Sequence, residues 1–279
     1  MEHYDILIVG GGAAGISAAK AAKGKKVLLA EREGELGGIL LQCAHRGFGG
    51  DLSGMEYAET LLCGLENVEI SLDTTVLSIE ADKTALISQK DCGRRKISFS
   101  RLLLATGAME IPAGALPIAG DRPKGVYTAG MMQKLVNCHG FVPSGPVVIL
   151  GSGDIGLIMA ATLAKMNIPV TLVERENSLG GMARNRRRLD GLDVDIRLGS
   201  TVSEIYGEKE LEAVLLSNGE ELECRTLLIA VGLECDRKLI KKLGNHEWLR
   251  LCGNCERVHP MIESVINDGT QAGEWACGK

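Results

Sequence analysis

The chain has 279 residues, enough for about two domains that each bury a core. Its formal net charge is −5, so it lacks the basic excess that is typical of nucleic-acid-binding proteins. No uncharged apolar run approaches the ~20 residues of a membrane helix. Residues 1–12 lack the layout of a signal peptide and the nine scattered cysteines suit free thiols, so we expect a cytoplasmic protein.

The first predicted elements are a strand, a glycine turn and a helix. The apolar run 5–9 leads into Gly10, Gly12 and Gly15, spaced G-x-G-x-x-G, and the alanine-rich stretch 16–23 follows. In a dinucleotide-binding turn the first glycine permits the tight turn. The second lets the backbone approach a pyrophosphate, and the third lets helix and strand pack closely. The beginning of the chain therefore predicts a dinucleotide site at a helix N-terminus.

An acid at the end of the next apolar run strengthens this prediction. Residues 27–30 lead directly to Glu31, near the distance of about 20 residues at which such an acid accepts hydrogen bonds from ribose hydroxyls. Segments 85–88 and 96–99 then alternate like strands. A buried-looking strand, 102–107, closes this half.

The same elements recur about 140 residues later. Gly151, Gly153 and Gly156 follow a second apolar run, and Glu174 ends the run after that. Strand-like segments follow again, and residues 227–232 close the second half. One G-x-G-x-x-G alone can be a glycine turn that binds nothing, but its recurrence with all its flanking elements argues for two dinucleotide sites.

This doubled pattern resembles the two-dinucleotide-fold flavoproteins, the pyridine nucleotide–disulfide oxidoreductase superfamily. The resemblance implies an α/β fold of two Rossmann-like domains in three layers (β/β/α), the second inserted into the first. It places FAD in residues 1–115 with 245–279, and NADH or NADPH in 118–240. Proline and glycine cluster at 111–123, as expected of a connection between domains.

The resemblance also assigns individual residues. Ala105-Thr106-Gly107 matches a motif beside the flavin, and residues 249–254 match a late strand that ends in Gly-Asp, with Asn254 in place of Asp. Asn still bonds a hydroxyl, without the charge. The expected FAD contacts are Gly10, Gly12, Ala13, Ala14, Gly15, Glu31, Arg32, Gly38, Val76, Ala105, Thr106, Gly107, Gly253 and Asn254. The expected nicotinamide-dinucleotide contacts are Gly151, Gly153, Asp154, Gly156, Glu174, Arg175 and Gly232.

Residues 37–49 resemble a narrower group. Their sequence is similar to small FAD-dependent oxidoreductases found beside glycerol-phosphate and amine or hydroxy-acid oxidising systems. It is also similar to the flavin-bearing alpha chains of sarcosine-oxidase and opine-oxidase type dehydrogenases.

Two features point to different nicotinamide cofactors. A carboxylate at Glu174 favours the free 2′-hydroxyl of NADH and repels the 2′-phosphate of NADPH. Arg175 and the basic run 184–188 are either a solvated face or a contact to that phosphate. We therefore expect NADH, with NADPH as the alternative.

Three cysteines are candidate redox groups. Cys252 and Cys255 form a C-x-x-C, which is either a redox pair or two unpaired thiols, and no second pair completes a zinc site. Cys43 has no second cysteine five residues away. It is either a lone redox thiol beside His45 and Arg46 or a packed small hydrophobe. We expect no metal site.

The resulting hypothesis is an oxidoreductase that passes hydride from NADH to FAD and electrons on to an unidentified small-molecule or protein acceptor. One alternative is the nucleotide-binding component of a larger dehydrogenase of amines or hydroxy acids, with a partner subunit. Another is a regulator that binds nucleotide without turnover. Residues 233–251, shorter than the family's usual connection, leave the tightness of FAD binding open.

Overall fold

A parallel sheet forms the centre of the first unit in the computed structural model, which describes residues 1–65 and 68–278. Its strands run in the order β5-β2-β1-β8-β20. Their bounds are β1 Glu2–Val9, β2 Val27–Ala30, β5 Glu69–Ser71, β8 Gly93–Leu104 and β20 Leu249–Leu251. Strands β1 and β2 are apolar runs, as expected where both faces of a parallel sheet are covered.

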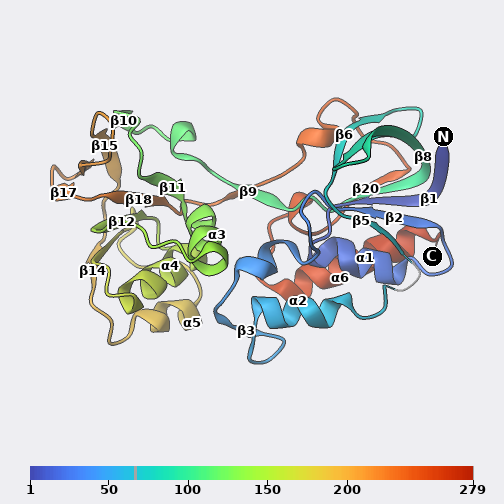
Figure 1. Ribbon diagram of the computed structural model, residues 1–279. Coiled ribbons are helices and arrows are strands. Elements are labelled where there is room, and N and C mark those ends of the chain that lie inside the picture. Colours follow the sequence, from blue (N-terminus) through green and yellow to red (C-terminus); the bar gives the residue numbers. More distant parts are fainter. Residues whose placement is uncertain (66–67, 279) are drawn as a thin grey trace. The chain divides into compact units, whose positions relative to one another are not determined.

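Two different layers cover this sheet (Figure 1). On one face lie α1 (Ala13–Ala21), α2 (Gly54–Leu62) and α6 (Ile262–Ala276). On the other lies an antiparallel meander of β6 (Thr74–Glu80), β7 (Thr84–Gln89) and the first half of β8. Smaller elements are η1 Gly38–Gln42, β3 Arg46–Phe48, β4 Leu52–Ser53, η4 Lys238–Ile240 and η5 Gly253–Cys255.

The second unit repeats this architecture with its own core. Its parallel strands run β14-β13-β12-β18-β11, and a meander of β15, β16 and β17, with β10 beside β15, covers one face. The strands are β10 Ala119–Gly120, β11 Val126–Thr128, β12 Val147–Leu150, β13 Val170–Val173, β14 Val194–Arg197, β15 Val202–Tyr206, β16 Ala213–Leu216, β17 Glu221–Glu223 and β18 Thr226–Ile229. The helices are η2 Ala113–Ala115, α3 Ala129–His139, α4 Asp154–Lys165, α5 Ala183–Arg186 and η3 Arg187–Leu189. The predicted three-layer α/β fold class is thus confirmed.

The units exchange chain at two points. The first comprises Met1–Met109 and Glu234–Lys279, and the second Glu110–Leu233. The crossing segments pair as β9 (Ala108–Glu110) and β19 (Leu233–Cys235). Residues 234–240, which we expected at the end of the second domain, therefore belong to the first unit. No helix in the described part of the chain is long and apolar enough to cross a lipid bilayer.

Candidate dinucleotide sites

The first glycine turn joins the end of β1 to the start of α1. Gly10 has a φ of +105°, and a Cβ there would overlap the Ala105 carbonyl oxygen. A Cβ at Gly15 would overlap the carbonyl oxygen of Gly10. These two glycines are therefore required by packing within the protein.

Gly12 differs from both. Its φ of −78° suits any residue, and the nearest described atom to a Cβ at Gly12 is the Gly38 Cα, 4.0 Å away. Neither backbone conformation nor chain packing explains a glycine here. A ligand that must approach the backbone closely does explain it, and the position therefore fits a pyrophosphate.

Helix α1 begins at Ala13 and presents its first turn without a side-chain cap. Its N-cap residue is Gly12, and no acid lies in the first turn. The first N–H groups of a helix have no partner within the helix and carry a partial positive charge. Both properties suit a phosphate at this end of α1.

The second turn has the same geometry. Gly151 has a φ of +103°, and a Cβ at Gly156 would overlap the Gly151 carbonyl oxygen. A Cβ at Gly153, by contrast, would come no closer than 3.8 Å to its nearest described neighbour, the Ala230 oxygen. In both units the second glycine alone faces open space.

Glu31 and Glu174 do the same structural work in the two units. Glu31 is 7% exposed and accepts the N–H of Gly11 at 2.5 Å and that of Glu33 at 2.8 Å. Glu174 accepts the N–H of Ser152 at 2.8 Å and that of Glu176 at 3.0 Å. Each carboxylate thus fixes its own glycine turn. A carboxylate has about four acceptor positions, so capacity for ribose hydroxyls is left over.

Glu174 stays ionised at neutral pH. Burial raises the pKa of its carboxyl, but hydrogen bonds from Glu176, Ser152 and Arg175 outweigh burial and lower the pKa below its ordinary value. A permanent negative charge at this position favours a ribose hydroxyl over a ribose phosphate.

Asp154 has partners within the protein. Its Oδ1 accepts the N–H of Met182 at 2.7 Å and the Asn185 amide at 2.8 Å. These bonds tie the basic segment 184–188 to the beginning of α4. Arg188 in turn donates to Asn185. The basic run that we left open as a solvated face or a phosphate contact is therefore attached to the second glycine turn.

The segments around Gly253 converge on the first turn. A Cβ at Gly253 would lie 2.6 Å from the Ala14 Cβ, so the end of β20 lies against the start of α1. The Gly253 N–H donates to Asp268 Oδ2 at 2.6 Å, and Asn254 Oδ1 accepts the His259 N–H at 2.9 Å. Asn254 therefore keeps only its amide N–H groups for a ligand.

Asp268 and His259 form a pair that sequence reasoning did not assign. His259 Nε2 lies 3.5 Å from Asp268 Oδ2, and its side chain is 6% exposed. This ring nitrogen has no hydrogen-bond partner among the described residues. Asp268 sits within α6, where no motif marks it, so only the contact with Gly253 reveals it.

The remaining expected contacts are spread over the first unit. Thr106 Oγ1 donates to the Asp236 carbonyl at 2.6 Å, which ties the Ala105-Thr106-Gly107 motif to the returning chain. Gly38 lies against Gly12. Val76, by contrast, is in the core between sheet and meander, and Arg32 is an exposed neighbour of Glu33. In the second unit, Arg175 is exposed and pairs with Glu176, and Gly232 has a φ of +133°.

The candidate redox thiols are buried. Cys255 Sγ donates to the Leu104 carbonyl at 2.8 Å, and Cys252 Sγ lies 3.7 Å from the same oxygen. Burial raises the pKa of both thiols. Cys43 is 8% exposed and donates to the Ile39 carbonyl at 3.3 Å. Because a thiolate is the reactive form, this geometry favours the alternative that these are packed, unreactive thiols. Among the described residues no cluster could hold a metal ion.

Comparison with known proteins identifies the family. Residues 4–248 match the family model described as pyridine nucleotide-disulphide oxidoreductase. The chain belongs to this family. This membership confirms the resemblance that the doubled glycine pattern predicted.

Individual members differ in how much of their length they share with the chain. It is 27% identical to one of the opine oxidase subunits of Agrobacterium tumefaciens over 79% of its own length and 48% of the relative's. The chain thus spans about half of that protein. Thioredoxin reductase of Treponema pallidum is 27% identical over 82% of this chain and 76% of that one. The crystal structure of T. acidophilum thioredoxin reductase superposes with a TM-score of 0.80 at 21% identity, covering 99% of this chain and 98% of that one, which shows the shared fold.

Proposed function

We propose that the chain is an FAD-dependent oxidoreductase that takes hydride from NADH and passes electrons to an acceptor. The observation that carries the proposal is the pair of glycine turns in which Gly12 and Gly153 face open space. Members of the family use FAD and NAD(P)H as cofactors. Both turns fit the diphosphate of such a dinucleotide.

The first unit would hold FAD and the second NADH. In the first, Gly12 and the N-terminus of α1 would bind the diphosphate, and Glu31 a ribose. In the second, Gly153 and Glu174 would do the same work. Bound FAD would supply the electron-accepting chemistry, while the protein binds and orients. No side chain has to move a proton for hydride transfer itself.

Spectroscopy tests this function directly. We expect the purified protein to show a flavin absorbance spectrum that bleaches when NADH is added anaerobically. Bleaching by NADPH at the same rate would contradict the preference assigned to Glu174 and would favour the basic segment 184–188 as a phosphate contact. A flavin spectrum that neither nucleotide bleaches would contradict the reductase activity.

Gly12→Val tests the first site without disturbing the fold. Since a Cβ at Gly12 meets no described atom within about 4 Å, we expect unchanged thermal stability and FAD affinity lowered by at least about tenfold, because the side chain occupies the diphosphate position. Gly114→Ala, at another glycine with no neighbour around its Cβ, is the matched control. Unchanged FAD affinity in Gly12→Val would refute the assignment of the turn.

A second function is favoured by the match to the opine oxidase of Agrobacterium tumefaciens. Because the chain spans 48% of that relative, it would work as the dinucleotide-binding part of a larger dehydrogenase. Flavin reduction by NADH without turnover by the isolated chain, together with a partner that co-purifies, would favour this alternative. The buried thiols of Cys224, Cys252 and Cys255 support the cytoplasmic localisation that we propose, because reduced cysteines persist in a reducing compartment.

A further inference from the structure

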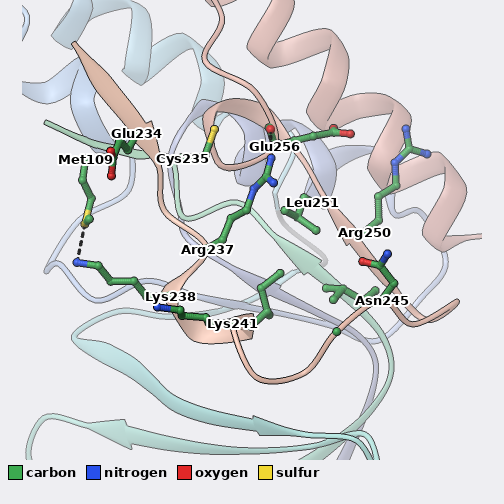
Figure 2. A pocket seen from close by; sticks show the side chains of 13 residues that line it. Met109, Glu234, Cys235, Arg237, Lys238, Lys241, Asn245, Arg250, Leu251 and Glu256 are labelled. Atoms are coloured by element: carbon green, nitrogen blue, oxygen red, sulfur yellow. Dashed lines mark hydrogen bonds between the residues drawn. The ribbon is translucent and has the colours of Figure 1, made fainter. Parts of the chain in front are cut away.

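A cavity of about 660 Å³ lies in the first unit, away from the glycine turns. Its walls come from the returning segment 234–245, from β20 and from Met109 and Glu256 (Figure 2). No lining residue belongs to either glycine fingerprint. The volume is within the range of about 300–1,000 Å³ that is usual for small-molecule sites.

The cavity carries uncompensated positive charge. Arg237, Lys238, Lys241 and Arg250 line it, against two carboxylates, in a protein whose net charge is negative. Lys238 Nζ contacts the Met109 thioether at 3.2 Å, which is a weak acceptor and does not neutralise an ammonium group. Among the described residues, no carboxylate lies within ion-pair distance of Lys238, Lys241 or Arg250.

One of the four cations is already engaged. Arg237 donates from Nε to the Cys255 carbonyl at 2.7 Å and from its terminal nitrogen to the Glu256 carbonyl. Its guanidinium holds the returning segment against η5. Arg250 lies 6.0 Å from the centre of the Trp275 ring, a contact that leaves its charge in place. The three cations other than Arg237 therefore act on whatever enters the cavity, and their fields add because they surround one space.

The remaining wall is apolar. Ile240, Leu249 and Leu251 line the cavity, and all three are half-buried, packing on the core between sheet and meander. A ligand that satisfies both walls has a charged group for the lysines and Arg250 and an apolar body for these side chains.

We propose that this cavity binds a small organic anion whose carboxylate or phosphate group contacts Lys238, Lys241 and Arg250. Its apolar body rests on Ile240, Leu249 and Leu251. The proposal goes beyond the dinucleotide sites and holds whether or not the chain binds FAD. It rests on the cavity and its charge alone.

The test is a calorimetric titration with three probes of similar size: benzoate, phenyl phosphate and the uncharged benzyl alcohol. We expect one or both anions to bind saturably and benzyl alcohol not to bind. The preferred anion shows whether a carboxylate or a phosphate is the natural group. FAD and NADH, added in excess, should leave this binding unchanged. Displacement of the anion by either nucleotide would place it at a glycine turn and overturn the proposal.

Charge variants locate the bound anion. We expect the double variant Lys238→Ala/Lys241→Ala to weaken anion binding by about tenfold or more, because charge-assisted contacts are lost. Lys242→Ala is the matched control, since Lys242 is an exposed neighbour that does not line the cavity. Both lysines of the double variant are exposed, so thermal stability should not change. No saturable binding of either anion, or an equal loss in Lys242→Ala, would overturn the proposal.

Discussion

At the scale of single residues, the two halves differ in what their helix N-termini present. Helix α1 starts with Ala13 and has no acid in its first turn, whereas α4 starts with Asp154, whose carboxylate is held by Met182 and Asn185. The first site is thus uncharged apart from the helix terminus and Glu31. The second has a fixed acid that organises a basic segment.

The bonds to Glu174 should also contribute to stability. Its pKa is lowered in the folded protein, so the stabilisation is fully present above the unfolded-state pKa and is lost as pH falls through the folded-state pKa. We expect Glu174→Gln to lower the free energy of unfolding by about 1 kcal/mol at pH 7, because the N–H groups lose a charged acceptor. Urea denaturation at pH 7 and below pH 4 measures this. A deficit that persists undiminished in acid would contradict the role of the charge.

At the scale of elements, α6 and α1 pack closely enough that glycine is needed between them. A Cβ at Gly269 would overlap the Ala14 carbonyl oxygen, and one at Gly273 that of Ala18. The small side chains of α1 allow the same approach from the other side. The contact holds the start of α1 between β20 and α6, and so fixes the position of the first glycine turn.

Gly269→Ala should separate these helices. Because the obstructing atom is backbone and cannot rotate away, we expect a loss of about 1–3 kcal/mol in unfolding free energy, as for overpacked cores. Gln271→Ala, at an exposed position of the same helix, serves as the control. Equal denaturation midpoints for the two variants would show that the helices are free to adjust.

At the scale of the whole molecule, the two units have separate cores, one on each side of each parallel sheet. A ligand that binds one unit stabilises that unit by mass action, by about 2.7 kcal/mol at a hundred times its dissociation constant. Each cofactor should therefore act on one unit.

Differential scanning calorimetry checks this expectation. We expect FAD to raise the midpoint of one unfolding transition and NADH that of another, and Gly12→Val to abolish only the response to FAD. A single transition that both nucleotides shift together would mean that the units unfold as one body.

Much of the fold could be predicted because it is encoded locally. The apolar runs before Gly10 and Gly151 became central parallel strands, and the alternating segments became the meanders. The helices after the turns begin at residues 13 and 154, earlier than the apolar stretches 16–23 and 157–166 suggested. A helix that begins within the glycine motif has no apolar periodicity to mark its first turn.

The candidate site was predicted in part for the same reason. Glycine spacing and an acid after a strand are patterns within about 20 residues, so they identify the turns, Glu31 and Glu174. The pairing of Asp268 with Gly253 and His259, and the tie from Asp154 to Asn185, depend on which elements become neighbours. No local pattern contains that information.

The sequence by itself determined the doubled strand–turn–helix unit, the family and the positions where a diphosphate can approach the backbone, since each depends on short-range spacing. Only the tertiary structure decided that Cys252 and Cys255 are enclosed, and that cations from the returning chain surround a cavity beside β20. Burial and electric field are sums over atoms that are distant along the chain, so they exist only once the chain has folded.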